Sequence, residues 1–188
     1  MLTENLRERF KRVSNKIGEI LGKTGLSPNF FTFLILVFGF IGAYFIYLGF
    51  FKLAILFVLI SGLMDFIDGA VAKANKKETK FGALFDSVAD KTSELSWYLA
   101  FGLFNPQLWL GSFLASSTFM LSSYISKHAK AVGGKGGGGL MERKERLILI
   151  ILGLIFIKYI SYFLYTIAFF SFITCLQRFF RNYKILQS

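Results

Sequence analysis

Four aspartates stand close together in the sequence. Asp65, Asp68, Asp86 and Asp90 fall within 26 positions, and the chain has no other aspartate. The first two are three residues apart and the last two are four apart, so on helices each pair would share one face. Carboxylates that converge in a partly dehydrated site repel one another and need a compensating charge. Since oxygen-only ligands favour Mg²⁺ or Mn²⁺ over zinc, the spacing predicts a site for divalent cations.

Two glycines lie beside these carboxylates. Gly69 directly follows Asp68, and Gly82 precedes Asp86 by four residues. A position without a side chain would let a nucleotide or a phosphate approach the backbone. Close packing between membrane helices is the alternative explanation for either glycine. The combined spacing favours a ligand site.

The composition indicates that membrane helices carry these residues. The chain of 188 residues is 54% hydrophobic and holds 24 Phe, which is unusual for a soluble domain of this length. A transmembrane helix needs about 20 apolar residues. The breaks "LGFFK" and "FNPQ" suit tight turns between such helices. We therefore expect an all-α integral membrane protein with six transmembrane helices, near 29–51, 52–73, 83–104, 107–127, 146–162 and 163–181.

The basic residues support this count and predict an orientation. Of the 22 Lys and Arg residues, nineteen fall before residue 28, at 73–80, at 127–146 or after residue 176. Six helices place these four segments on one side, and the positive-inside rule makes that side the cytosol. We expect a multi-pass protein of the cell membrane with both termini and the aspartates at the cytosolic side. The net charge of +11 then faces anionic lipid headgroups rather than nucleic acid.

Two segments outside the apolar runs have their own patterns. Residues 3–22 repeat apolar side chains at nearly 3.6-residue spacing among basic residues, which is typical of a helix lying on a membrane surface. We therefore divide the chain into a cytosolic amphipathic juxtamembrane segment, 1–27, and one six-helix domain, 28–188. The glycine-rich stretch 133–139 lacks the features of a phosphate-binding loop and predicts a flexible connection.

The aspartate stretch can be compared with a known signature. "DFIDGAVAK", eight further residues and "GALFDSVAD" resemble D-x2-D-G-x2-A-R-x8-G-x3-D-x3-D, the signature of the CDP-alcohol phosphotransferase family. Lys73 stands at the arginine of this signature, and every other fixed position matches. "LSPNFFT" is also similar to the Pro-Asn-x-x-Thr with which the first helix of the family begins. The chain is identified as a member of this family.

The resemblance implies a reaction and a set of residues. Such enzymes transfer a phosphoalcohol from a CDP-linked donor to an acceptor hydroxyl and release CMP. Two Mg²⁺ or Mn²⁺ ions would neutralise the pyrophosphate. Lys73 keeps the charge of arginine but lacks its planar fork. By matching position, Asp65, Asp68, Asp86 and Asp90 would bind metal, Asp90 would also be the catalytic base, and Asp65, Asp68, Gly69, Ala72, Lys73, Gly82 and Asp86 would bind the CDP-lipid.

The acceptor is indicated by a second resemblance. "GLMERKERLIL" (139–149) is similar to a Glu-Arg-x-Glu-Arg segment of family members that use inositol phosphate, the phosphatidylinositol-phosphate and archaetidylinositol-phosphate synthases. "SSYISKHAK" (122–130) departs from them, because Ser126 and His128 stand where basic residues are expected. We interpret His128 as a polar residue near a helix end. The residues predicted to contact the acceptor phosphate are Ser123, Lys127, Arg143, Arg146 and Arg178, and membrane anchoring is the alternative role of the arginines.

The sequence is also compatible with another acceptor and with another function. Glycerol 3-phosphate is the alternative acceptor in the same reaction. A cation or metabolite transporter is a distant alternative, because intramembrane carboxylates often mark ion paths. A transporter would favour charges near the membrane centre in several helices, whereas the four aspartates gather near one face. A homodimer is expected only because similar enzymes form one.

Overall fold

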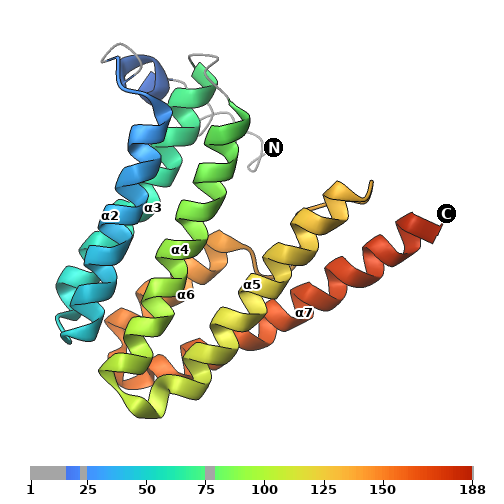
Figure 1. Cartoon of the computed structure of the whole chain (residues 1–188). Helices are drawn as coiled ribbons and strands as arrows, with labels where there is room; N and C mark the ends of the chain where they lie inside the picture. Colours follow the sequence, from blue (N-terminus) through green and yellow to red (C-terminus); the bar gives the residue numbers. More distant parts are fainter. Residues whose placement is uncertain (1–15, 22–24, 75–78, 188) are drawn as a thin grey trace, which may run out of the picture. The chain divides into compact units, whose positions relative to one another are not determined.

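The computed structural model describes residues 16–21, 25–74 and 79–187, which fold into helices and contain no strand among them (Figure 1). The predicted all-α class is therefore confirmed. The predicted surface helix at 3–22 lies largely outside the described residues, and 16–21 are helical. The helices, joined by two short 3-10 turns, are α2 (Pro28–Tyr47), α3 (Phe51–Ala74), α4 (Lys80–Phe104), η1 (Pro106–Leu108), α5 (Trp109–Ala131), α6 (Arg143–Ile155), η2 (Ile157–Tyr159) and α7 (Ile160–Gln187).

The chain divides into two compact units, which are described separately. Unit 1 comprises Met1–Gly42 and Leu56–Ser96, and thus most of α2, α3 and α4. Unit 2 comprises Ala43–Ile55 and Trp97–Ser188, and thus the remaining ends of those helices together with α5, α6 and α7.

Unit 1 is held together by small polar residues that let its helices approach closely. The hydroxyls of Ser61 on α3 and Ser93 on α4 both donate to the backbone carbonyl of Ile35 on α2, at 3.0 and 3.1 Å. Gly39 faces Ser93, and a Cβ at this glycine would lie 2.5 Å from the serine side chain. Buried serines and glycines are the usual means of packing helices in a membrane, where apolar burial alone gives little preference. The three helices therefore have a fixed register, which also fixes the aspartates.

Unit 2 is built on the pairing of α7 with α5 and α6. Gly111 on α5 lets Leu164 of α7 approach, since a Cβ at the glycine would lie 3.3 Å from that of the leucine. Helix α6 ends at Ile155, because the φ of −103° and ψ of 56° at the next residue, Phe156, are not helical. The predicted helix at 146–162 is therefore wrong in length: α6 has 13 residues, about 20 Å, and the turn η2 separates it from α7.

In the part of the chain that the structure describes, four helices are long and apolar enough to cross a membrane: Pro28–Tyr47, Phe51–Ala74, Pro106–Ala131 and Ile157–Gln187. Among the described residues α4 and α6 are the remaining predicted spans. The first carries charged residues along its length, such as Asp86, Asp90 and Lys91, and the second is short. A multi-pass membrane protein is thus supported, and the count of six stays a prediction.

Both predicted interhelical turns are confirmed. After α2 the chain turns at Gly49, whose φ of 76° is in the left-handed region where a side chain would be strained. After α4 it turns at Asn105, whose side chain accepts a hydrogen bond from the Gln107 N–H at 3.0 Å. Pro106 follows as the first residue of η1, where the N–H that proline lacks is not needed.

Candidate active site

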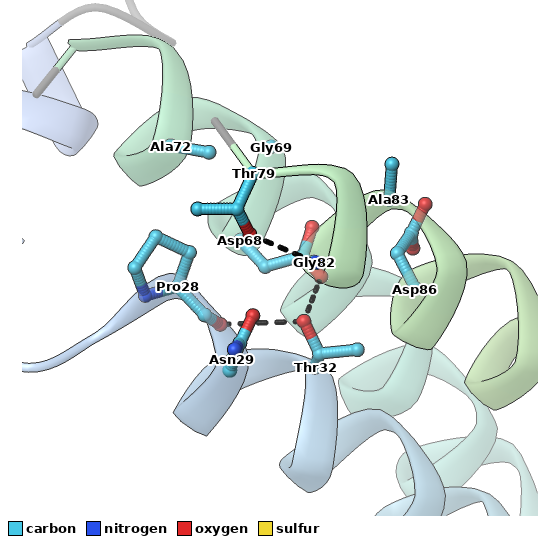
Figure 2. A pocket seen from close by; sticks show the side chains of 10 residues that line it. All are labelled: Pro28, Asn29, Thr32, Asp68, Gly69, Ala72, Thr79, Gly82, Ala83 and Asp86. Carbon is cyan, nitrogen blue, oxygen red and sulfur yellow. Dashed lines mark hydrogen bonds between the residues drawn. The ribbon is translucent and has the colours of Figure 1, made fainter. Parts of the chain in front are cut away.

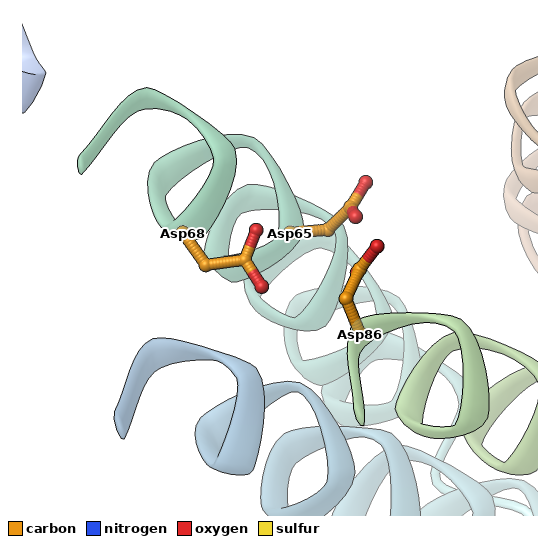
Figure 3. A group of neighbouring side chains, drawn as sticks. All are labelled: Asp65, Asp68 and Asp86. Carbon is orange, nitrogen blue, oxygen red and sulfur yellow. The ribbon is translucent and has the colours of Figure 1, made fainter. Parts of the chain in front are cut away.

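Three of the four aspartates converge in unit 1. Asp65 and Asp68 project from α3 and Asp86 projects from α4 toward them (Figure 3). One carboxylate oxygen from each lies within 4.8 Å of the other two. Asp68 is buried, with 6% of its surface exposed, and the other two are half-buried. The i, i+3 spacing on α3 and the register between the helices produce this convergence, as the sequence predicts.

Asp68 is oriented by a residue that the sequence analysis did not assign to the site. The hydroxyl of Thr32 on α2 donates to Asp68 Oδ2 at 2.7 Å (Figure 2). The Pro28 carbonyl is a more distant acceptor at 3.3 Å, so the carboxylate is the better partner for the single hydroxyl proton. Only 2% of Thr32 is exposed. The threonine of the "PNFFT" sequence was the available signal for this contact.

Asp90 occupies a different place from the other three. It lies four residues after Asp86 on α4 and is buried, with 8% of its surface exposed. The group of converging acidic side chains found among the described residues consists of Asp65, Asp68 and Asp86. Asp90 is thus buried like Asp68 but is not a member of this group, and its roles as metal ligand and catalytic base stay predictions.

A pocket of about 350 Å³ opens beside the cluster (Figure 2). The pocket is lined by five of the seven residues predicted to bind the CDP-lipid. The other two, Asp65 and Lys73, are not among the described lining residues. Lys73 is exposed in the last turn of α3. The sequence pattern could not distinguish a lysine that points into a site from one that extends into solvent. The lining residues are Pro28, Asn29, Thr32, Asp68, Gly69, Ala72, Thr79, Gly82, Ala83 and Asp86.

The two glycines of the pocket have different roles. At Gly69 an added Cβ would meet no described atom within 4 Å, so the glycine leaves open space in the pocket. At Gly82 a Cβ would lie 3.0 Å from Thr79 Oγ1 and 3.2 Å from Asn29 Oδ1, which is close contact. Thr79 Oγ1 also accepts the Gly82 N–H at 2.9 Å. Gly82 thus permits close packing around the pocket, whereas Gly69 preserves its volume.

The donor set fits a divalent cation. Three oxygen-only ligands within 4.8 Å of one another, one of them fixed by Thr32, match the preference of Mg²⁺ and Mn²⁺. Three carboxylates so close together also require a positive charge to offset their repulsion. Mg²⁺ or Mn²⁺ is therefore the cofactor that Asp65, Asp68 and Asp86 are suited to hold.

A second polar site lies in unit 2, around Arg178 of α7. Its Nε donates to the carbonyl of Gly138 at 2.8 Å, and its Nη1 donates to both the carbonyl and the hydroxyl of Ser122 at 2.8 Å. Arg178 is buried, with 7% of its surface exposed. The sequence predicted Ser123 rather than Ser122 as the acceptor-phosphate residue, because a resemblance in a helical segment does not show which of two neighbouring residues faces α7.

The glycine-rich loop is held by side chains of α5 and α7. The prediction of a flexible connection missed these contacts, which come from residues 11 to 47 positions away. Gly137 and Gly138 have φ values of 72° and 70°, a conformation that other residues rarely adopt. Arg181 donates to the carbonyl of Gly137. Three more side chains accept hydrogen bonds from backbone N–H groups between α5 and α6. Asn182 Oδ1 accepts from Lys135 at 2.7 Å, Ser126 Oγ accepts from Gly137 at 2.8 Å, and Thr174 Oγ1 accepts from Met141 at 2.9 Å.

The remaining predicted acceptor residues lie on α5 and α6. Arg146 is buried, and its guanidinium lies 4.9 Å from the centre of the Phe119 ring, in cation–π contact. Arg143 and Ser123 are half-buried and Lys127 is exposed. These residues belong to the same unit as Arg178. His128 stacks on Tyr124 with ring centres 5.5 Å apart, in agreement with its interpretation as a polar residue near a helix end.

The chain is similar to known proteins over most of its length. Residues 26–176 match the sequence profile of the CDP-alcohol phosphatidyltransferase family. The chain belongs to this family and is a transferase. It is 32% identical to the phosphatidylinositol phosphate synthase of Mycobacteroides abscessus, over 80% of this chain and 71% of that protein. It is 29% identical to the archaetidylinositol phosphate synthase of Pyrococcus horikoshii, over 99% of both chains.

Solved structures extend the comparison. The structure of Mycobacterium tuberculosis phosphatidylinositol phosphate synthase with CDP-DAG bound has a TM-score of 0.82 and 27% identity, and the match covers 92% of this chain and 94% of that one. A structure of the same synthase in complex with manganese and citrate has a TM-score of 0.81 and 27% identity, over 90% of this chain and 88% of that one. A manganese complex of a similar protein supports the assignment of a divalent cation as cofactor.

Proposed function

We propose that this protein transfers a phosphatidyl-type (diradylglycerol phosphate) group from a CDP-linked lipid to the hydroxyl of inositol 1-phosphate and releases CMP, in phospholipid biosynthesis. The observation that carries the proposal is the convergence of Asp65, Asp68 and Asp86 beside a pocket of about 350 Å³. The family and the neighbour solved with CDP-DAG bound support the donor, and the relatives named phosphatidylinositol phosphate synthase and archaetidylinositol phosphate synthase support the acceptor.

The pocket of unit 1 binds the CDP group in this proposal. Gly69, Ala72 and Gly82 contact the cytidine nucleotide, and the open space at Gly69 is what such a ligand needs. Asp65, Asp68 and Asp86 hold the divalent cations, two in number. When bound, the cations neutralise the pyrophosphate and stabilise the departing CMP. Lys73, exposed beside the pocket, contributes a positive charge to the approach of the donor.

Asp90 is the proposed general base. In the reaction the acceptor oxygen forms a bond to the phosphorus of the lipid-linked phosphate, and the bond from that phosphorus to the CMP oxygen breaks. The proton of the acceptor hydroxyl goes to the carboxylate of Asp90. A share in binding the metal is the second role proposed for Asp90, and a Mn²⁺ titration of Asp90→Asn tests it. A carboxylate that is buried next to the cluster, yet outside it, is suited to accept this proton. General-base help of this kind gives roughly 10²–10⁴-fold acceleration.

The polar site of unit 2 binds the acceptor phosphate. Arg178 and Arg146 are buried guanidinium groups, and buried cations are well suited to bind a phosphate dianion. Arg143 on α6 and Ser123 and Lys127 on α5 add further donors from the same unit. Several cations in one unit suit a phosphorylated acceptor better than serine or free inositol, which carry no phosphate.

The membrane arrangement is also proposed. Six helices, α2 to α7, cross or enter the bilayer within the domain 28–188, and the amphipathic segment 1–27 lies on the cytosolic surface. Both termini and the site face the cytosol, because nineteen of the 22 basic residues would then follow the positive-inside rule. Of the charged residues of α4, Asp86 lines the pocket. The protein acts as a homodimer in the cell membrane.

The test is an acceptor panel with purified protein, CDP-diacylglycerol and Mg²⁺ or Mn²⁺, with CMP release as the readout. We expect release with inositol 1-phosphate and none with free inositol or serine. Release with glycerol 3-phosphate alone would establish the alternative, a phosphatidylglycerophosphate-type synthase with the same chemistry. An ether-linked CDP-lipid serves as a second donor. Absence of CMP release with every donor and acceptor would contradict the proposed function.

A further inference from the structure

Glu142 is the residue through which the glycine-rich loop meets α6. It is the N-cap of that helix, and its carboxylate Oε1 accepts the N–H of Gly138 at 2.8 Å. The same oxygen lies 3.8 Å from Nη2 of Arg178. The side chain of Glu142 is 49% exposed, whereas that of Arg178 is 8% exposed. An accessible carboxylate therefore occupies a place between a backbone donor and a buried guanidinium.

The partners of this carboxylate are fixed by other contacts. Arg178 uses Nε for the Gly138 carbonyl and Nη1 for Ser122, which leaves Nη2 directed to Glu142. Gly138 is in the left-handed conformation that brings its N–H to the same oxygen. A backbone N–H beside a guanidinium binds a phosphate oxygen as well as a carboxylate oxygen. The fixed part of this arrangement is an anion site, and its present occupant belongs to the chain itself.

Glu142 also has another partner available if it leaves that place. Its side chain accepts a hydrogen bond from the backbone of Glu145 in a capping box, and Glu145 Oε2 accepts the Glu142 N–H at 3.0 Å. The N-terminus of α6 therefore keeps its cap when Glu142 releases Gly138. An exposed carboxylate with a second hydrogen-bond partner can be displaced without leaving a buried group unsatisfied.

We propose that Glu142 is an internal substitute for the acceptor phosphate. Its carboxylate occupies the place between Gly138 and Arg178 until a phosphorylated acceptor displaces it. Glu142 is then a specificity-determining residue, because a doubly charged phosphate competes with a carboxylate for this site and a neutral alcohol does not. This inference rests on the proposed function in one respect, that the acceptor carries a phosphate.

The test is the variant Glu142→Gln. The amide keeps an oxygen for the Gly138 and Glu145 N–H groups but removes the competing charge. We expect the KM for inositol 1-phosphate to fall by about two- to fivefold, as is usual for a half-exposed ion pair, with kcat little changed. The affinity for inorganic phosphate, measured by calorimetry without donor, should rise by a similar factor. Both effects should diminish at high salt, which screens the pair.

Glu145→Gln is the matched control. It removes the same charge from the same helical turn, but from a carboxylate that bonds the Glu142 backbone. We expect its KM and phosphate affinity to equal those of the wild type. Equal changes of KM and phosphate affinity in both variants would show that any loss of negative charge in this turn has the same effect, and would overturn the inference. A higher KM or weaker phosphate binding in Glu142→Gln would also overturn it, because Glu142 would then support the site.

The phosphate measurement separates this inference from the proposed function. If the wild type releases no CMP with any phosphorylated acceptor, the proposed function fails, and the change in phosphate affinity still decides the role of Glu142. If the wild type turns over but phosphate affinity does not change in Glu142→Gln, the inference alone is wrong.

Discussion

The carboxylate pocket of unit 1 and the glycine-rich loop of unit 2 obtain their geometry in different ways. In the pocket, Asp65, Asp68 and Asp86 stand on regular helices, where spacing in the sequence nearly determines direction in space. In the loop, the position of Gly138 depends on left-handed backbone and on contacts from residues about 40 positions away. The geometry of the pocket therefore depends on which residues occupy a few helical positions, whereas the geometry of the loop depends on the contacts that support it.

The largest effect is expected from a substitution of Asp90, which tests whether this residue acts apart from the three clustered carboxylates. In Asp90→Asn the amide cannot take the acceptor proton, so we expect kcat to fall by roughly 10²–10⁴-fold. Because Asp90 lies outside the group of three, Mn²⁺ affinity should stay close to that of the wild type. Steady-state kinetics and a Mn²⁺ titration measure the two quantities. A large loss of Mn²⁺ affinity would instead make Asp90 a metal ligand.

Thr32→Val tests how far the pocket depends on a residue outside the cluster. Valine keeps the shape of threonine but removes the hydroxyl that donates to Asp68 at 2.7 Å. Outer partners of metal ligands typically contribute 10- to 100-fold in affinity or activity, and we expect the Mn²⁺ affinity to fall by about that range. Thr166→Val, which changes an exposed hydroxyl of α7 that bonds its own helix, is the matched control. Equal Mn²⁺ affinity in wild type and Thr32→Val would contradict the account.

Asn182→Ala tests the loop in the same manner. The variant removes the acceptor of the part-buried Lys135 N–H and the donor of a buried hydrogen bond to the Arg178 carbonyl, both at 2.7 Å. Loss of a buried partner costs about 1–3 kcal/mol, which should appear as a lower free energy of unfolding. We also expect a severalfold higher KM for inositol 1-phosphate with an unchanged KM for the CDP-lipid. A higher donor KM would show that the loop does not act on the acceptor alone.

Gly69→Ala should change the stability of the protein least, and it should raise stability rather than lower it. Alanine is favoured over glycine inside a helix by about 0.5–1 kcal/mol, and its Cβ would meet no described atom within 4 Å. We therefore expect slightly greater thermal stability together with a higher KM for the CDP-lipid, because the methyl group enters the pocket.

Gly102→Ala is the contrasting control for that variant. Its Cβ would lie 2.7 Å from the ring of Trp109, so this variant should lose stability. Gly102 is also not among the described residues that line the pocket, so its donor KM should stay unchanged. A stable Gly69→Ala variant with unchanged donor KM would show that the ligand does not use this space.

The same contrast explains how much the sequence could predict. The helical class, the turns at Gly49 and Asn105 and the convergence of three aspartates all follow from local patterns, namely apolar runs, turn residues and i, i+3 spacing. The contact of Thr32 with Asp68 joins residues 36 positions apart, and only the motif suggested it. The support of the glycine-rich loop could not be predicted, because glycines without side chains give no pattern that identifies their partners.

The end of α6 shows a further limit of the sequence. Residues 147–157 are apolar throughout, and hydropathy gives no indication that the helix ends after Ile155. A Cβ at Gly153 would lie 2.5 Å from the side chain of Ile160 in the helix that follows, so the chain packs closely on itself where it leaves α6. Hydropathy does not reveal contacts of this kind.

The central claim, that the aspartate cluster holds a divalent cation for transfer from a CDP-linked lipid, is tested most directly by metal removal and return. Purified protein is stripped with a chelator, supplied with CDP-diacylglycerol and inositol 1-phosphate, and assayed for CMP release as Mn²⁺ is added back. We predict no release without metal, full recovery in the wild type and no recovery in Asp86→Asn. Release that continues without metal, or full recovery in Asp86→Asn at the same Mn²⁺ concentration, would contradict the account.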